Sequence, residues 1–535
     1  MIFDWLERRR LVRKGLACDK TRLSNPEDNL PGRLDSSWMV RLLILAFFVV
    51  LLHLGVAWGN HGDNREDQIF AFIVFICGLM LLEIDDGTIW GSNSKLTLLF
   101  GATWINLAMV KALFLFWSSN DPAVVARLYF ISPCTFAPFL VTMLLGTRAG
   151  LFSVVQVSML ASLLADRVLI DKNFTFLFVS LLSGFTAVYF SRNVRKRFDL
   201  IKAGFAVGCL NLLCAVVLGL VHGRSWDALS WQALCGIGAG IITPMVVSSI
   251  LPLVEWMFQI TTPISWLELA DLNHPLLQQM TMEAPGTYHH SLMVANLAES
   301  GAKAVGVDPT ACRVMAYFHD IGKIIKPEYF TENIPPGANP HENLSPTMSA
   351  LIIIAHVKEG IDLALKYRLK KQVLDAIQQH HGDSLVTYFH QRALQQQRDA
   401  REGGKIMNMR EDDVPEVSEN SFRYPGPRPQ TKEIAILSLA DAVEAASRSL
   451  EKPTAQRVED LVNEIVEHKI STHQLDESHL TMNEIRAAAE AMSATLKNML
   501  HTRISYARKE KSNASTIVKP TRRSSTTGPS ASAAA

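Results

Sequence analysis

Seven histidine and aspartate side chains in the second half of the chain are of the types that hold metal ions. They are His290, the dyad His319 and Asp320, His356, the pair His380 and His381, and Asp441. Eight of the sixteen histidines fall between residues 289 and 390 of this 535-residue chain. A lone histidine on a helix usually has a structural role, and an HD dipeptide occurs by chance in many proteins. Because the seven residues occur together, they predict a metal centre.

The placement of these residues favours convergence on shared ions. Successive residues of a helix diverge by about 100°, so His380 and His381 can meet at one ion only where a helix ends. Gly382 follows them directly and is a residue typical of such an end. Asp441 interrupts an apolar helical stripe that begins at Ile434, where an unpaired carboxylate is unfavourable. Its alternative to binding a cation is a buried salt bridge with a lysine or arginine.

The ligand types indicate which ions would bind and what reaction they would support. Imidazole and carboxylate groups without thiolates favour first-row ions such as iron or manganese over a structural zinc site. Two ions about 3.5 to 4 Å apart lower the pKa of a water between them and stabilise both oxygens of a displacement at phosphorus. The seven cysteines form no CxxC pair, which argues against a thiolate site or a disulfide framework. We therefore expect two divalent transition-metal ions, Mn or Fe, and a hydrolytic reaction.

The segments that carry these side chains have helical patterns with explicit boundaries. Ser345 is expected to cap a helix that starts at Pro346 and ends at Gly360. Strand-like alternation is scarce after residue 260, which indicates an all-helical domain. The polar segment from Gln391 to Asn420 interrupts the ligand set and is expected to form a flexible surface loop.

The first half of the chain consists of apolar stretches that approach the roughly 20 residues needed to cross a membrane. Eight such stretches lie at 42–58, 69–84, 96–117, 128–145, 149–165, 174–190, 203–221 and 234–254. Nine Lys or Arg residues precede the first stretch and five lie at 191–202, and an eight-span count places both groups on one side. The alternative is that one or two stretches are buried helices of a soluble domain.

These patterns predict an all-α protein with a polytopic transmembrane helical bundle followed by an all-helical cytoplasmic domain. The expected segments are a basic cytoplasmic N-terminal segment at 1–41, about eight spans at 42–258, a phosphohydrolase domain at 259–508 and a disordered tail at 509–535. The N-terminus, the basic loop and the phosphohydrolase domain should then share the cytoplasmic side.

Five segments of the second half carry more specific motifs. They are LELADLNHPLLQQMTMEAPGTYHHSLMVANLAE at 267–299, YFHDIGK at 317–323, LSPTMSALIIIAHVKEG at 344–360, QQHHGDSLVTYF at 378–389 and FRYPGPRPQTKE at 422–433. HDIGK by itself marks only the wide HD superfamily, whereas FRYPGPRPQTKE is specific. Together the segments resemble the seven-transmembrane HD family of PgpH-type cyclic di-AMP phosphodiesterases, over about residues 128 to 505.

The resemblance implies an all-helical HD domain with a dinuclear site that Asp320 bridges. One ion would be held by His290, His319, Asp320 and Asp441, and the other by Asp320, His356, His380 and His381. The implied reaction opens cyclic di-AMP to linear pApA, with Asp320 and Lys323 as catalytic residues. The implied location is the inner membrane of a bacterium, with the HD domain in the cytoplasm.

The resemblance and the charges also suggest substrate contacts and partners. Lys323 resembles the family's phosphate-side lysine, and its alternative is a solvated lysine at a helix end. Arg423, Arg428 and Lys432 are candidates to steer or hold phosphates, and their alternative is to pin the proline-rich loop in which they lie. The partners implied are a cyclic dinucleotide and the lipid bilayer, without a nucleic-acid polymer, and a homodimer is left open.

The chain departs from the family in one respect. Only about ten residues, 59–68, separate the first two apolar stretches, where the family usually has a large extracellular domain. Sensing of an extracellular ligand is therefore in doubt.

The rival functions are an HD enzyme for cyclic di-GMP or another nucleotide, a catalytically degenerate membrane receptor and a transporter with a regulatory domain. A GYP motif after the paired histidines would mark a cyclic di-GMP enzyme, and the loss of metal ligands would mark a degenerate receptor. Neither feature occurs here.

Overall fold

The computed structural model describes residues 34–58, 65–85, 87–117, 122–165, 173–335, 337, 339–406, 416–450 and 454–501. Across these ranges the regular elements are helices, and the one β-type pairing is an isolated bridge between Leu385 and Arg423. The predicted all-α fold class is therefore confirmed. Residues 1–33 and the predicted tail at 509–535 lie outside the described residues.

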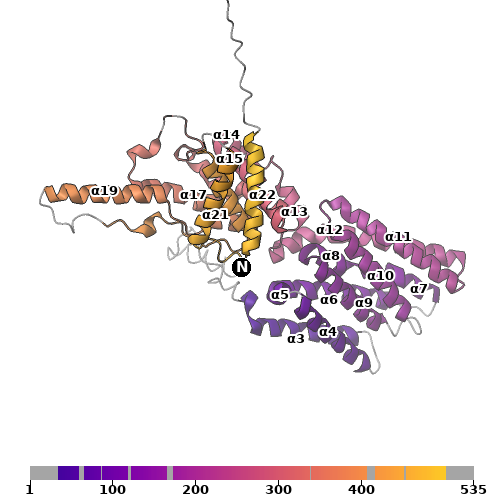
Figure 1. Cartoon of the computed structure of the whole chain (residues 1–535). Coiled ribbons are helices and arrows are strands. Elements are labelled where there is room, and N and C mark those ends of the chain that lie inside the picture. The colour runs from indigo at the N-terminus through magenta and orange to yellow at the C-terminus, as the bar shows by residue number, and fades with distance from the viewer. Residues whose placement is uncertain are drawn as a thin grey trace, which may run out of the picture.

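The first half of the chain forms a bundle of long apolar helices (Figure 1). The bundle contains α3 (Trp38–Ala57), α4 (Arg65–Asp85), α5 (Gly87–Trp90), α6 (Asn93–Phe116), α7 (Pro122–Ile131), α8 (Phe136–Leu145), α9 (Thr147–Ala165), α10 (Asn173–Ser191), α11 (Arg197–Val221) and α12 (Trp226–Phe258). Each of the eight predicted stretches falls in these helices, and α7 and α8 share one. Seven candidate spans occur among the described residues, so the chain is a multi-pass membrane protein.

The helix absent from these seven candidates is α4, which carries charges at both ends, including Arg65 and Glu83. Its course through the bundle is nevertheless defined by its neighbours. The Asn93 side chain donates a hydrogen bond to the Ser37 carbonyl over 2.9 Å, so α3 and α6 start at the same end of the bundle. Because α4 must bring the chain back to that end, the structure is compatible with eight passes, and the eighth pass stays a prediction.

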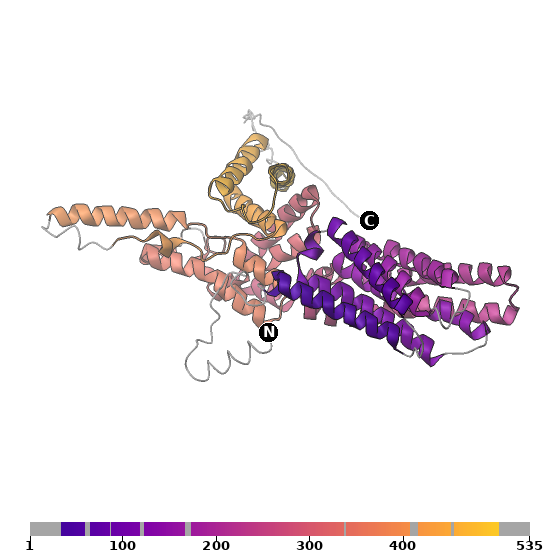
Figure 2. The same ribbon diagram turned by 90° about the horizontal axis from the view of Figure 1, so that it is seen from below.

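The start of α3 and the basic loop before α11 lie at the end of the bundle that faces the second half of the chain (Figure 2). Arg197, at the start of α11, forms an ion pair of 3.0 Å with Glu268 of α13. The basic loop and the second domain therefore share one side, as predicted. The side of the membrane that they face stays a prediction.

The second half of the chain forms a helical domain with its own buried core. Its helices are α13 (Pro263–Leu269), α14 (Pro275–Glu283), α15 (Pro285–Val305), α16 (Pro309–Phe318), η2 (Ile321–Ile325), η3 (Pro327–Tyr329), η4 (Pro340–Asn343), α17 (Pro346–Lys366), α18 (Lys371–Gln379), α19 (Thr387–Ile406), η6 (Glu419–Phe422), α20 (Lys432–Ser447), α21 (Ala455–Ser471) and α22 (Met482–His501).

The predicted start of α17 is confirmed, but its predicted end is wrong. The Ser345 hydroxyl accepts a hydrogen bond from the Met348 amide over 3.2 Å, as an N-cap does. The helix then runs through Gly360 to Lys366. Gly360 serves close packing instead, because a Cβ atom built on it would lie 2.9 Å from Cγ2 of Ile377 and 3.3 Å from the amide nitrogen of Gly322 in η2.

The prediction of a loop from Gln391 onwards is also wrong up to Ile406. This stretch continues α19, which begins at Thr387 and projects away from the domain (Figures 1 and 2). Its first turns are anchored because Phe389 and Ala393 are buried against α17 and η6. The polar composition beyond this anchor reflects an exposed helix rather than irregular backbone.

The junction between the two halves is a buried polar cluster around Glu255, near the end of α12. Only 3% of Glu255 is exposed, and its carboxylate accepts hydrogen bonds from the Thr262 amide over 3.2 Å and the Ser265 hydroxyl over 2.6 Å. Lys370, the residue before α18, donates to the same carboxylate over 3.0 Å. Gln372 of α18 donates to the Gln259 carbonyl over 3.0 Å. The last membrane helix is therefore bonded directly to the start of α18.

Replacement of Lys370 by Met should weaken this junction. Glu255 would keep its neutral donors but lose its charged partner, at a cost of about 1–3 kcal/mol. We expect a lower melting temperature of the full chain in detergent and faster proteolysis near residues 259–262. Lys371→Met is the matched control, since Lys371 is exposed and its ion pair among the described residues is with Asp375 of its own helix. Equal behaviour of the two variants would contradict the prediction.

Candidate metal centre

The seven predicted ligands are positioned mainly by helix ends. His319 is the C-terminal cap of α16, and Asp320 precedes η2. His380 caps α18 in the same way, and Gly382 after His381 has a φ of 57°, in the left-handed region. As predicted, the paired histidines therefore lie where regular helix ends, which lets adjacent side chains turn toward one centre. The remaining ligands come from within helices, His290 from α15, His356 from α17 and Asp441 from α20.

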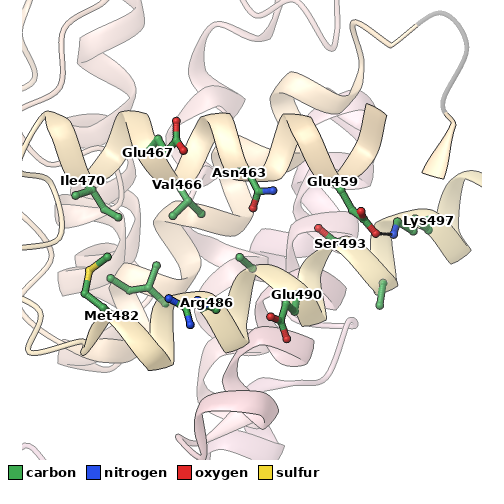
Figure 3. A pocket seen from close by; sticks show the side chains of 13 residues that line it. Glu459, Asn463, Val466, Glu467, Ile470, Met482, Arg486, Glu490, Ser493 and Lys497 are labelled. Atoms are coloured by element: carbon green, nitrogen blue, oxygen red, sulfur yellow. Dashed lines mark hydrogen bonds and ion pairs between the residues drawn. The ribbon is translucent and has the colours of Figure 1, made fainter. Parts of the chain in front are cut away.

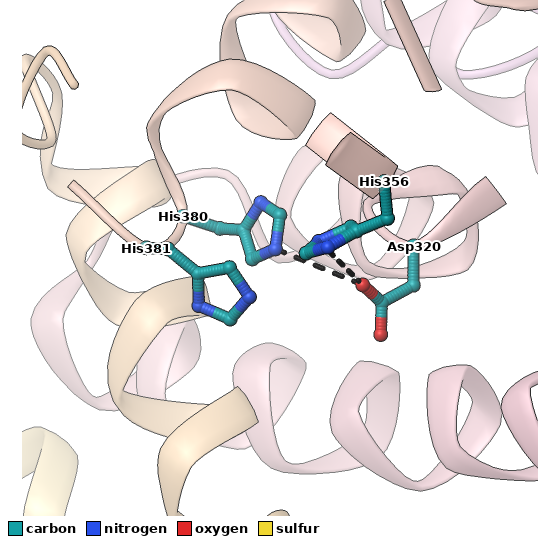
Figure 4. Close-up of side chains that lie close together, drawn as sticks. All are labelled: Asp320, His356, His380 and His381. Atoms are coloured by element: carbon teal, nitrogen blue, oxygen red, sulfur yellow. Dashed lines mark ion pairs between the residues drawn. The ribbon is translucent and has the colours of Figure 1, made fainter. Parts of the chain in front are cut away.

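All seven side chains converge in two groups that share one carboxylate. The first group is Asp320, His356, His380 and His381, drawn in Figure 4, and the second is His290, His319, Asp320 and Asp441. Within each group the potential ligand atoms lie within 4.8 Å of one another. Their membership matches the two ligand sets that the sequence resemblance implies.

The two oxygens of Asp320 face the two groups separately. Oδ1 lies 3.4 Å from Nε2 of His356 and 3.7 Å from Nε2 of His380. Oδ2 lies 3.2 Å from Nε2 of His319 and 3.4 Å from Nε2 of His290. Asp320 is 1% exposed, so bulk water cannot be the partner of either oxygen. This geometry suits a carboxylate that bridges two cations.

Several buried atoms of the cluster have no hydrogen-bond partner among the described residues. They include Nε2 of His319, His356 and His380 and Oδ1 of Asp320. A buried polar atom without a partner is costly, and a native structure normally provides one. Lone pairs of three imidazoles and of Asp320 Oδ1 thus converge without a hydrogen-bond donor, whereas Lys323 pairs with Oδ2, so the residues fit bound metal ions.

The other ring nitrogens of these histidines are anchored to the protein. Nδ1 of His319 is 2.8 Å from the Ala316 carbonyl, and Nδ1 of His356 is 2.5 Å from the Ile353 carbonyl. Nδ1 of His380 lies 2.9 Å from the Ile377 carbonyl. A carbonyl can only accept, so each Nδ1 carries the hydrogen and each Nε2 presents a lone pair to the centre. This arrangement is typical of metal-bound histidines.

A carboxylate that the sequence reasoning missed anchors the fourth histidine. Oε2 of Glu444 is 2.5 Å from Nδ1 of His290, whose Nε2 faces Asp441 at 3.0 Å. Glu444 is 6% exposed and lies one helical turn after Asp441. The spacing of three residues was the available signal, because it places both carboxylates on the same face of α20.

Charge and burial divide the histidines into two classes. Burial disfavours a charged imidazole, and with the nearby His319 it lowers the pKa of His380 to about 3. Burial acts in the same direction on His319, but Asp320 and Asp441 outweigh it and raise the pKa of His319 to about 9. The carboxylates thus attract positive charge to the centre, which bound cations would supply instead of protons.

A cavity of about 780 Å³ opens onto the metal-ligand cluster. Its lining includes His290, His356, His381 and Asp441 from the cluster, the aromatic residues Tyr329, Phe330, Tyr388, Phe389 and Tyr424, and the cations Lys323 and Arg448. The Tyr424 ring packs against His381 at an interplanar angle of 31°, with centroids 4.3 Å apart. The cavity therefore combines the potential metal-ligand atoms with aromatic side chains and positive charge.

Lys323 lies in this cavity rather than at a solvated helix end. Its side chain is 13% exposed, and its ammonium is 2.8 Å from Oδ2 of Asp320 and 2.9 Å from Oε1 of Glu332. Burial works against the Glu332 carboxylate, but Lys323 outweighs it and lowers the pKa of Glu332 to about 2. Glu332 had no sequence signal, and it holds the lysine beside the cluster.

The three other cations predicted to contact substrate do not line the cavity. Arg423 binds the Asp383 carbonyl over 3.0 Å, and Arg428 forms a 3.0 Å ion pair with the Asp383 carboxylate. Lys432 forms an ion pair of 2.5 Å with Glu484 of α22. These contacts correspond to the alternative role of pinning the proline-rich loop, and a role in substrate binding stays a prediction.

A second cavity, of about 750 Å³, lies between α21 and α22 (Figure 3). Its lining contains none of the seven ligands, and Glu459 and Lys497 form an ion pair on its wall. Chemistry that depends on the metal centre therefore belongs to the first cavity.

Comparison with known proteins identifies similar sequences for both halves. A family model described as "7TM receptor with intracellular HD hydrolase" matches residues 37–262, and an HD domain model matches residues 287–446. The chain is 33% identical over 442 residues to the cyclic-di-AMP phosphodiesterase PgpH of Listeria monocytogenes, covering 81% of this chain and 58% of the relative. It is 34% identical over 380 residues to PgpH of Bacillus subtilis, covering 70% and 51%.

The chain thus spans little more than half the length of these curated relatives. Two solved structures of the L. monocytogenes PgpH HD domain, one in complex with cyclic-di-AMP, are also similar. Each is 39% identical, with a TM-score of 0.38, and the match covers 43% of this chain and 100% of the solved chain.

Replacement of single ligands should change the number of bound ions in a defined way. We expect about two Mn ions per chain, fewer than one in Asp320→Asn because both groups lose their shared carboxylate, and about one in His290→Ala. Metal content would be measured on the purified chain after dialysis. His289→Ala is the control, because His289 is exposed and should keep both ions. Two retained ions in Asp320→Asn would refute the shared-ligand assignment.

Glu444→Gln should weaken metal binding without removing a ligand. Glutamine can still accept a hydrogen bond from Nδ1 of His290, but it lacks the negative charge of Glu444. Loss of such an outer partner typically costs about 10- to 100-fold in metal affinity. Titration with Mn would measure the change. Glu433→Gln, on the same helix, should bind Mn like the wild type, and an unchanged affinity in Glu444→Gln would argue against the anchoring role.

Proposed function

The chain belongs to the family of seven-transmembrane receptors with an intracellular HD hydrolase, and on this basis we propose that it hydrolyses cyclic di-AMP to pApA. The observation that carries the proposal is the buried Asp320 carboxylate, which faces a different group of metal-ligating atoms with each oxygen. The named activity of the two PgpH relatives supports the choice of substrate.

The proposed centre holds two divalent ions, with Mn or Fe favoured by the nitrogen and oxygen donors. When bound, the ions supply Lewis acidity and make water a stronger nucleophile at neutral pH. His290, His319, Asp320 and Asp441 would hold one ion, and Asp320, His356, His380 and His381 the other.

The other residues of the cavity orient the substrate. Lys323 is fixed between Asp320 and Glu332, and its remaining N–H can be donated to a phosphoryl oxygen next to the centre. Tyr388 lines the same cavity, is 67% exposed and offers a face on which a base can stack. His319, Asp320 and His380 are buried, so bulk water has little access to this part of the centre and electrostatic interactions are stronger there.

We also infer that the centre faces the cytoplasm of a bacterium from its inner membrane. The loop from Ser191 to Lys202 carries five basic residues and lies on the same side as the HD domain through the contact of Arg197 with Glu268. Cytoplasmic loops carry an excess of such residues. A cytoplasmic second messenger would then reach the cavity without crossing the bilayer.

Hydrolysis by the full chain in lipid nanodiscs provides the test. We expect Mn-loaded protein to convert cyclic di-AMP to pApA faster than it opens cyclic di-GMP, with the products separated by chromatography. EDTA should abolish the reaction, and Asp320→Asn should lower kcat by at least about 10³-fold. His289→Ala serves as the active control. A preference for the guanine dinucleotide, or turnover in Asp320→Asn, would refute the proposal.

A further inference from the structure

Arg448 is the C-terminal cap of α20 and lines the same cavity as Asp441, which lies within that helix. Asp441, Ala445 and Arg448 are spaced as successive turns of one helix face, and all three line the cavity. Seven residues of helix correspond to about 10 Å along the axis. The Cα atom of Arg448 is therefore offset from that of Asp441, and both side chains line the same cavity.

The guanidinium is held in a fixed orientation. Its Nε lies 3.0 Å from Oε2 of Glu444, and its Nη2 lies 3.1 Å from Oε1. Glu444 in turn anchors His290, so the position of Arg448 is tied to that of a metal ligand. Nη1 makes no hydrogen bond to any residue that the structure describes, and 36% of the side chain is exposed. Donor groups of Arg448 are thus available to a molecule in the cavity.

A cyclic dinucleotide has a second phosphodiester that the metal centre cannot hold at the same time. Its two phosphates lie on opposite sides of the ring, so when one is at the ions the other must lie elsewhere in the cavity. Lys323 contacts Asp320 and is therefore placed to bind the phosphate at the ions. Among the described residues that line the cavity, Arg448 is the other lysine or arginine.

We propose that Arg448 binds the phosphate that is not being cleaved, and so selects cyclic dinucleotides over substrates with a single phosphodiester. This inference rests on the proposed function. The planar guanidinium fork matches phosphate oxygens better than an ammonium group does. Because Glu444 compensates the charge of Arg448, its contribution comes from directed hydrogen bonds rather than from net charge.

The test compares two substrates in the Mn-loaded full chain. Cyclic di-AMP has two phosphodiesters, whereas bis(p-nitrophenyl) phosphate has one. In Arg448→Gln we expect KM for cyclic di-AMP to rise about 10- to 100-fold, as loss of a charge-assisted hydrogen bond does. kcat/KM for bis(p-nitrophenyl) phosphate and the Mn content should stay within about twofold. Arg448→Lys keeps the charge and the pairing with Glu444, and should restore only part of the KM.

Arg313→Gln is the matched control, because Arg313 is similarly exposed at 38% and pairs with Glu299 outside the cavity. It should leave both substrates unaffected. Equal losses for both substrates in Arg448→Gln would overturn the inference and assign Arg448 to the support of His290 through Glu444. Unchanged kinetics for both would overturn it as well. If wild-type protein cleaves only bis(p-nitrophenyl) phosphate, the proposed function itself fails.

Discussion

The buried carboxylate of Asp320 is the constraint on which the rest of the second domain depends. A charged group that is 1% exposed is tolerated only when cations or donors surround it. Lys323 provides one positive charge, and four imidazole rings turn a nitrogen toward its two oxygens. The fold therefore has to bring α15, α16, α17 and α18 to one point, and Asp441 of α20 completes the enclosure.

Glycine makes this convergence sterically possible. A Cβ atom on Gly322 would lie 1.8 Å from the His356 carbonyl, so only glycine lets η2 pack against α17 at this distance. Asp320 and His356 are consequently brought within reach of one another. Gly382 has the same importance after His380 and His381, because its left-handed φ ends α18 while both rings still face the centre.

The sequence was sufficient to predict the helical class, the apolar stretches and the seven side chains that converge, because these depend on residue type and periodicity. It failed where the outcome depends on neighbours distant in the chain. The roles of Gly360 and of the polar helix α19 follow from packing against η2, α17 and η6. Arg428 carries the charge expected of a phosphate ligand, but its partner Asp383 was not foreseeable from spacing. Glu332 and Arg448 enter the cavity only through the tertiary fold.

Tertiary contacts also join the two halves of the protein. Residues 259–262 would be a short linker by length alone, yet Glu255 at the end of α12 is buried and bonded to Lys370. Lys370 is the N-cap of the nine-residue helix α18, and the residues after that helix are His380 and His381. One short helix therefore connects the last membrane helix to two of the seven ligand side chains. A flexible tether would leave the metal-ligand cluster independent of the bundle, whereas this buried ion pair makes the position of α18 depend on the end of α12.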